Sequence, residues 1–197
     1  MKTRERLILE AYKLYVSKPY DQVTFTELEK AMGLSRGAIL YHFKSKELLF
    51  NAVIERFVLE ESSISSLITE DCKGLLDFIK QFVAGCKDEI QKYRSYGIFN
   101  MNLAKFYIEF HAINHFENAA QLGKAWMDKE LIIWGKILSK AMQSNEIKDD
   151  LNLETLASVF INIYQGISFA GIIRSKGYDI ALLEKEFMMV YNLIKRN

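Results

Sequence analysis

The chain has 197 residues, half of them apolar, and a formal net charge of +1 at neutral pH. This length allows one or two small domains, and the apolar fraction is large enough for a hydrophobic core. No apolar run approaches the roughly 20 residues of a membrane-spanning helix, and the N-terminus lacks the apolar stretch and cleavage site of a signal peptide. The two cysteines lack CxxC spacing, which favours free thiols in a reducing cytoplasm.

One proline, ten glycines and few alternating apolar patterns predict an all-α chain of about nine helices. Charge is distributed unevenly along this chain. Residues 1–50 contain nine Lys or Arg against six Asp or Glu, whereas the remainder contains 17 against 19. The basic excess therefore lies in the N-terminal part, where it would suit the phosphates of a nucleic acid.

Residues 24–49 have the pattern of two short helices joined by a tight turn and followed at once by a third helix. Thr24 begins the first helix as the N-cap of a capping box. Gly33 ends that helix, because glycine adopts the left-handed C-terminal conformation without steric cost. Ser35 and Ser45 are the expected N-caps of the two helices that follow. This is the pattern of a helix-turn-helix, whose second helix enters the DNA major groove.

In this region the chain resembles the TetR (tetracycline-repressor-like) family of bacterial transcriptional regulators. The match covers the first quarter of the chain, and its string of spaced residues is specific. The resemblance implies a helix-turn-helix DNA-binding domain over 1–50 and a helical effector-binding and dimerisation domain over 51–197. The matching residues are Arg4, Ile8, Leu9, Thr24, Ala31, Gly33, Leu34, Ser35, Gly37, Tyr41, His42, Phe43, Lys44, Ser45, Lys46, Glu47 and Leu49.

Three positions depart from the family pattern. Leu40 stands where family members usually carry a tyrosine whose hydroxyl reaches a phosphate, so operator affinity or sequence preference could differ here. Glu29 stands in place of an alanine and puts a carboxylate on a helix that lies close to DNA. Pro19 replaces the glycine that usually ends the first helix, and it stops that helix by disfavouring the α conformation at the preceding residue.

Apolar spacing predicts the remaining helices. In the N-terminal part they cover about 3–17, 24–32 and 36–41, and a connector helix runs from 46 to as far as 67. In the C-terminal part they cover about 74–93, two short segments within 96–115, and then 116–143, 153–174 and 180–196.

The helix over 153–174 is apolar nearly all round, so two of its sides must be covered. One side faces the core, and we expect a partner subunit on the other. The helix over 180–196 has apolar residues at heptad-like spacing. By family resemblance, these two helices of each subunit pair as a four-helix dimer interface. Two recognition helices related by a two-fold axis then read a palindrome with half-sites ~34–36 Å apart, or a multiple of that distance.

The second helix of the helix-turn-helix carries the expected DNA contacts. Arg36 at its tip is the long donor suited to a bidentate contact with guanine, and small neighbours leave room for base edges. Tyr41, Lys44 and Lys46 are expected to hold phosphates; alternatively, Tyr41 and His42 only pack the small domain. The candidate DNA-binding residues are Thr24, Thr26, Ser35, Arg36, Gly37, Ala38, Tyr41, His42, Lys44 and Lys46.

Aromatic residues are dense between residues 96 and 134 and suggest an effector pocket among helices. Each one alone is more often a core residue, but together they predict a mostly apolar or aromatic effector. Polar anchors for it are His111, Asn114, His115 or Gln165. The candidate ligand-binding residues are Tyr96, Phe99, Phe106, Phe110, His111, Trp126, Trp134 and Tyr164.

His111 and His115 lie four residues apart, a spacing that can hold a transition metal on one helix face. No third ligand is evident and the HExxH glutamate is missing, so we predict neither a metal nor a cofactor. No phosphate-binding glycine loop, GxSxG motif or motif cysteine supports a small helical enzyme.

The sequence therefore predicts a cytoplasmic, homodimeric TetR-type repressor that is released from a palindromic operator by a small effector. The alternative within DNA-binding proteins is an effector-independent regulator or an activator.

Overall fold

The computed structural model describes residues 3–59, 64, 72–115 and 119–196. These residues are helical and contain no β-strand, which confirms the all-α prediction; an isolated bridge joins Ile147 and Lys195. Among the helices of this described part, none combines the length and the apolar character needed to cross a membrane. The chain divides into an N-terminal unit, Met1–Glu61 with Leu103–Ala120, and a C-terminal unit, Ser62–Asn102 with Gln121–Asn197. The domain boundary expected at residue 50 stays a prediction.

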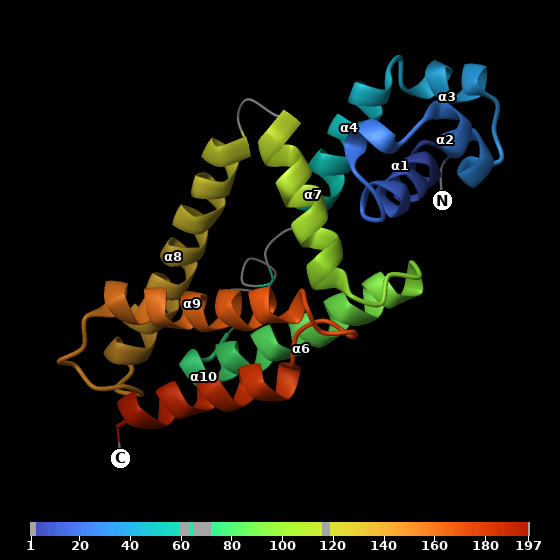
Figure 1. The fold of residues 1–197 in the computed structure, drawn as a ribbon. Coiled ribbons are helices and arrows are strands. Elements are labelled where there is room, and N and C mark those ends of the chain that lie inside the picture. The colour runs from blue at the N-terminus through green and yellow to red at the C-terminus, as the bar shows by residue number, and fades with distance from the viewer. Residues whose placement is uncertain (1–2, 60–63, 65–71, 116–118, 197) are drawn as a thin grey trace. The chain divides into compact units, whose positions relative to one another are not determined.

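Helices α1 to α4 follow one another in the N-terminal unit (Figure 1). Their caps explain their bounds. The side chain of Thr24 accepts a hydrogen bond from the backbone of Glu27, whose own side chain accepts one from the backbone of Thr24, which confirms the capping box. Gly33 has φ +65° and ends α2 in the left-handed conformation, and Ser35 and Ser45 cap the next two helices as expected. The elements are α1 Thr3–Tyr15, a 3-10 turn Tyr20–Gln22, α2 Phe25–Met32, α3 Arg36–His42, α4 Lys46–Ile54 and a π-helical turn Glu55–Leu59.

The core of this unit lies where α1 packs against α2 and α4. Leu7, Leu28 and Ile39 have no exposed surface and come from α1, α2 and α3, respectively. At the edge, Arg6 donates a hydrogen bond to the carbonyl of Met32, 3.0 Å away, and ties α1 to the end of α2. The helix-turn-helix is thus fixed by buried side chains on one side and leaves its other side open.

Helix α7, Met101–His115, runs from the C-terminal unit into the N-terminal unit. Two short helices were expected between residues 96 and 115, and this was wrong. The reason is Gly97, which has φ +80° and ends the preceding helix, α6 (Leu75–Ser95), with hydrogen bonds from Gly97 and Ile98 back to Arg94 and Tyr93. The loop continues to Asn100, and residues 101–115 then form a single helix.

The last turns of α7 pack on the N-terminal unit through histidines. The ring of His115 lies 4.8 Å from that of Tyr20 and 6.4 Å from that of Phe50. His111, one turn earlier, is 6% exposed, and its Nε2 has no hydrogen-bond partner among the described residues. Burial lowers the pKa of His111, His115 lowers it further, and Asp21 opposes both effects.

In the described part of the C-terminal unit there are four helices, and α10 packs against both α6 and α9. Its core is aromatic: Trp134 of α8 stacks on Phe160 at 4.8 Å and meets the edge of Phe187 at 5.6 Å. The helices are α6 Leu75–Ser95, α8 Ala119–Gln143, α9 Leu153–Gly171 and α10 Ile180–Ile194. These agree with the predicted segments to within a few residues. The expected start of α8 at residue 116 and most of the continuation of α4 toward residue 67 lie outside the described residues.

Side-chain amides join the end of α9 to the start of α7. Asn100 Nδ2 donates to the carbonyls of Gly171 and Arg174, at 3.1 and 2.6 Å, and so satisfies the open C-terminus of α9. Asn102 Oδ1 accepts from the backbone of Tyr178 at 2.9 Å. Both amides are within the C-terminal unit, so the first turn of α7 is fixed to the end of α9.

Glu146 caps α6 from a distant part of the chain. Its two carboxylate oxygens accept hydrogen bonds from the backbone amides of Leu75 and Leu76 at 2.9 and 2.8 Å. The N-terminus of a helix leaves such amides without intrahelical partners and favours negative charge.

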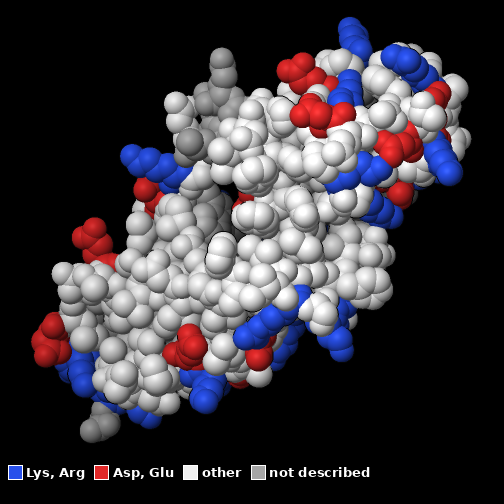
Figure 2. Space-filling model, in the orientation of Figure 1, with Lys and Arg blue, Asp and Glu red and all other residues white. Residues whose placement is uncertain are grey.

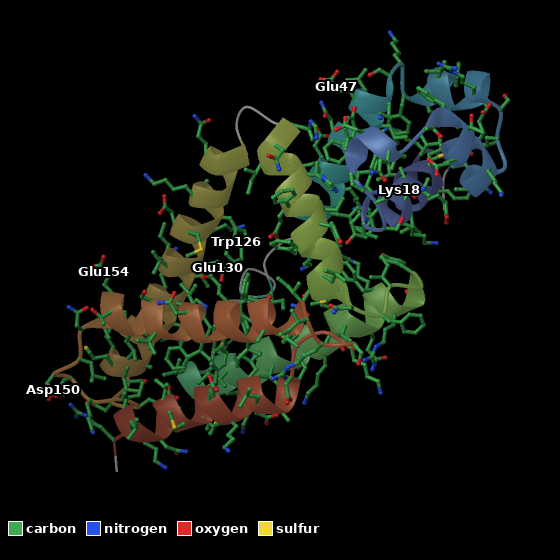
Figure 3. All side chains as sticks on the ribbon, viewed as in Figure 1. Lys18, Glu47, Trp126, Glu130, Asp150 and Glu154 are labelled. Carbon is green, nitrogen blue, oxygen red and sulfur yellow. The ribbon has the colours of Figure 1, made fainter. Side chains whose placement is uncertain are left out.

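We therefore expect Glu146→Ala to lower the free energy of unfolding by about 1–3 kcal/mol, because two amides lose their acceptor. Urea unfolding followed by circular dichroism measures this change. The control is Asp150→Ala, which removes an exposed carboxylate four residues further along the chain (Figure 3). Equal stability of the two variants would contradict the capping role.

Acid should destabilise the protein through His111. Since its pKa is lowered in the folded state, the unfolded chain binds the proton more readily, and stability falls as the pH drops below the ordinary value of 6.5. We expect His111→Leu to have a smaller loss of stability between pH 7.5 and pH 5 than the wild type. Parallel pH slopes for the two proteins in chemical unfolding would rule out this role.

Candidate functional site

Helix α3 presents one face to the core and the other to solvent. Ile39 has no exposed surface, whereas Arg36 and Gly37 are exposed and Tyr41 is 85% exposed. Ser35 Oγ accepts from the backbone amide of Ala38 at 3.3 Å, which fixes the start of the helix. The exposed face thus holds a long cationic side chain, a residue without a side chain and an aromatic hydroxyl. Such a face can approach base edges and phosphates together.

Arg36 is held from two sides. Its guanidinium lies over the ring of Phe25, 4.7 Å from the centroid, in cation–π geometry. Its backbone amide donates to Glu29 Oε1 at 2.5 Å. The carboxylate that departs from the family pattern therefore caps α3, and Phe25 orients the side chain expected to read bases. Nothing in the sequence indicated that Phe25 contacts Arg36.

The two lysines expected to hold phosphates differ. Lys44 is exposed. Lys46 Nζ instead donates to the carbonyls of Tyr20 and Val23, both at 3.1 Å, and lies 4.2 Å from the centroid of the Tyr20 ring. Its ammonium therefore links α4 to the turn before α2. An ammonium has three N–H donors, and two of them are used in this link.

The other candidate DNA residues lie at helix ends. Thr24 and Thr26 are exposed at the start of α2. His42 is half-buried and meets the ring of Tyr41 edge-on at 5.3 Å. Lys18 hydrogen-bonds Glu27 next to Thr24, and with the Thr24 backbone it lowers the pKa of Glu27 to about 2. All ten candidates belong to one unit, and their DNA contacts stay a prediction.

Figure 2 shows Lys and Arg side chains mixed with Asp and Glu over α1 to α4 on the visible face. On this face the charges of the two signs are thus interspersed rather than separated. Positioning of individual cations such as Arg36 matters more here than net charge.

The candidate effector residues are divided between the two units. Phe106, Phe110 and His111 belong to the N-terminal unit, whereas Tyr96, Phe99, Trp126, Trp134 and Tyr164 belong to the C-terminal unit. Phe99 is 70% exposed, and Trp134 is 1% exposed within the aromatic core. Two of the predicted polar anchors are already engaged, since Asn114 donates to the carbonyl of Phe110 at 2.7 Å and Gln165 donates to Met127 Sδ at 2.8 Å. Effector binding by these residues stays a prediction.

Tyr164 is the candidate with the richest polar surroundings. Its ring meets Phe82 edge-on at 5.1 Å and Tyr178 at 6.2 Å. Burial raises the pKa of its hydroxyl well above the ordinary value, with further contributions from Glu89, Cys86 and Glu130. Sequence reasoning missed both glutamates. For Glu130 the sequence did indicate burial. It lies four residues from each tryptophan of α8 and therefore falls on the apolar face of that helix.

No group of three or more His, Cys, Asp and Glu side chains within the described part of the chain could hold a metal ion. His111 and His115 are used in packing against the N-terminal unit.

Comparison with known proteins identifies the N-terminal domain. Residues 7–53 match the model of "Bacterial regulatory proteins, tetR family". The HTH-type transcriptional repressor Rv1474c of Mycobacterium tuberculosis is 26% identical over 98% of this chain and 94% of that protein. The repressor BepR of Brucella suis is 23% identical over 91% and 85%. The crystal structure of reduced Escherichia coli NemR shares the fold, with a TM-score of 0.69 and 16% identity over all of both chains. Residues 7–53 therefore carry the DNA-binding domain of the TetR family of bacterial transcriptional regulators, and the whole chain is similar in sequence to repressors that have this domain.

Proposed function

We propose that this regulator is a homodimeric repressor that binds a palindromic DNA operator through α3. A small effector, mostly apolar or aromatic, binds the C-terminal unit and releases the operator. The observation that carries the proposal is the exposed face of α3, where Arg36 stands at the tip of a capped recognition helix. Two relatives that match this chain over most of their length are named transcriptional repressors, which supports repression rather than activation. The proposal includes a cytoplasmic location, where the operator lies, and no catalytic residue.

In the DNA complex, Arg36 reads guanine while Tyr41 and Lys44 hold phosphates. Phe25 restricts the guanidinium before DNA arrives, which reduces the conformational entropy lost on binding. Gly37 and Ala38 let the backbone approach the base edges. Leu40, half-buried, offers no hydroxyl to a phosphate, so Tyr41 and Lys44 carry more of the backbone contact than in relatives with tyrosine there.

Dimerisation is supported by the apolar residues that α9 and α10 leave exposed. Phe169 is 71% exposed on α9, and Ile173 just after it is 90% exposed; Met189 and Leu193 on α10 are 59% and 65% exposed. Figure 2 shows mostly uncharged surface over α9 in this view. Adjacent exposed apolar faces on two packed helices suit an isologous interface with a second copy of the chain.

Release of DNA requires a path from the C-terminal unit to the N-terminal unit, and α7 supplies one. It begins where Asn102 holds the backbone of Tyr178 and ends where His115 packs on Tyr20. An effector that shifts the first turn of α7 would thus change the packing of its last turn. Retention of operator binding under every metabolite tried would favour an effector-independent regulator instead.

Arg36→Ala tests the recognition helix. We expect affinity for an operator selected from random DNA by the wild type to fall about 10- to 100-fold, because a bidentate guanine contact contributes about 1–3 kcal/mol. Affinity for unrelated DNA should change much less. Fluorescence anisotropy at fixed salt measures both. Lys30→Ala, which removes an exposed cation of α2, is the control, and an Arg36→Ala variant with undiminished discrimination would refute the assignment.

The oligomeric state tests the interface. We expect the wild type to have twice the chain mass of 22.9 kDa in light scattering, and Phe169→Glu to be monomeric, because a buried carboxylate at the interface is costly. Ile132→Glu makes the same change at an exposed site on α8 and should leave the dimer intact. A dimeric Phe169→Glu variant, or a monomeric wild type, would place dimerisation elsewhere or exclude it.

A further inference from the structure

All three histidines of the chain lie in the N-terminal unit, which contains the helix-turn-helix. His42 is on α3, whereas His111 and His115 are in the last turns of α7. Histidine is the side chain whose ordinary pKa places its change of charge between pH 5 and pH 8. Mild acid therefore changes the charge of the DNA-binding unit, and the C-terminal unit contains no histidine.

The imidazole of His111 is enclosed and incompletely hydrogen-bonded. The residue is 6% exposed, and its Nε2 is buried without a hydrogen-bond partner among the described residues. The ring centroids of Tyr107 and Phe110 lie 6.2 and 6.1 Å from that of His111. A second proton on the imidazole would put a positive charge in this aromatic site, and the Nε2–H would find no acceptor among these neighbours. The packed position therefore favours the neutral imidazole.

The charged groups around this site come from three elements and do not compensate a charge on His111. Burial disfavours that charge most, and a charge on His115, one turn later on α7, disfavours it further. Asp21 of the 3-10 turn favours it but is outweighed, so the pKa of His111 is held below its ordinary value. Helix α4 contributes Lys46 and Glu47, which act on the tyrosine of that turn.

His115 continues the packing from α7 to the helix-turn-helix. Its ring lies 4.8 Å from that of Tyr20. Lys46 lies over the same ring, and its Nζ donates to the carbonyls of Tyr20 and Val23. Val23 is the residue before Thr24, the N-cap of α2. The last turn of α7 thus helps to fix the segment from which the helix-turn-helix begins.

We propose that His111 and His115 form a pH-sensitive joint between α7 and the helix-turn-helix, which releases the operator in mild acid. When His111 gains a proton from solvent, it leaves its packed position, and the last turns of α7 move away from Tyr20. The start of α2 then loses one of its supports. This inference rests on the proposed function, since it adds an input to the same DNA-binding unit. The competing explanation is that acid only lowers the stability of the fold as a whole.

The proton acts here as a ligand that distinguishes two states of α7. In the displaced state His111 lies in water and has its ordinary pKa of 6.5, whereas burial lowers its pKa in the packed state. The packed state is therefore favoured fully above pH 6.5 and loses population as the pH falls below that value. Operator binding should follow the packed state.

Operator affinity at two pH values tests the joint. Fluorescence anisotropy at fixed salt compares pH 7.5 with pH 5.5, on an operator selected from random DNA at pH 7.5 and on unrelated DNA. We expect the operator Kd, relative to the Kd for unrelated DNA, to rise about 5- to 10-fold in acid, as is typical of coupled sites. Circular dichroism should show equal helical content at both pH values. An unchanged or lower relative Kd, or loss of helical content together with binding, would overturn the proposal.

His111→Leu removes the titrating group and keeps an apolar side chain in the packed position. Compared with its own value at pH 7.5, the relative Kd of this variant should change less than about twofold at pH 5.5, because no proton is left to bind at this position. The matched control is His42→Gln, which removes the histidine of the recognition helix and should keep the full acid response. An acid response that persists in His111→Leu, or disappears in His42→Gln, would show that the joint is not the cause.

Hydrogen exchange of the wild type without DNA decides if His111→Leu fails to fold. After correction for the intrinsic pH dependence of exchange, the amides in the last turns of α7 should lose protection between pH 7.5 and pH 5.5. Helix α9, in the unit without histidine, should keep its protection. Equal protection of α7 at both pH values, or parallel loss in α7 and α9, would overturn the proposal.

The two proposals fail in different ways. Absence of specific operator binding at pH 7.5 would defeat the repressor function. Specific operator binding that is insensitive to acid would defeat the pH-sensitive joint alone.

Discussion

The packing of α7 is the constraint on which the two halves of this regulator depend. Its first turn is fixed in the C-terminal unit by Asn102, which accepts a hydrogen bond from the backbone of Tyr178. Its last turns are fixed in the N-terminal unit, where His111 is buried and His115 lies against Tyr20. Helix α7 is therefore held by side-chain contacts at each end, one within each unit.

In the N-terminal unit, the last turn of α7 meets two aromatic rings, those of Tyr20 and Phe50. Tyr20 receives His115 on its ring, and Lys46 of α4 lies over the same ring while holding the carbonyls of Tyr20 and Val23. Val23 directly precedes Thr24, the N-cap of α2. A change at His115 thus reaches the start of the helix-turn-helix within a few residues. Lys46 takes part in this connection, and its expected contact with DNA stays a prediction.

The helix-turn-helix was predictable because its signals are local. Caps such as Thr24 and Ser35 and the left-handed Gly33 act on neighbouring backbone groups, so a single sequence reveals them. Contacts between distant residues were not predictable in this way. The capping of α6 by Glu146 joins positions 70 residues apart in the chain, and no periodicity indicates it. For the same reason, the aromatic residues could be located in the sequence but not divided into core residues and pocket residues. Trp134 lies in the core, and the burial of Glu130 on the same helix face was not predicted.

The two tryptophans of α8 sit two turns apart in different surroundings. Trp134 is enclosed by Phe78, Phe82 and Phe160, whereas Trp126 is partly exposed next to a buried carboxylate. Because these are the only tryptophans in the sequence, the protein contains two optical probes in separate environments. Emission from Trp134 follows the integrity of the aromatic core, and quenching of Trp126 follows events near Glu130. Replacement of either tryptophan by phenylalanine would separate the two signals, so that unfolding and ligand entry can be followed independently without any attached dye.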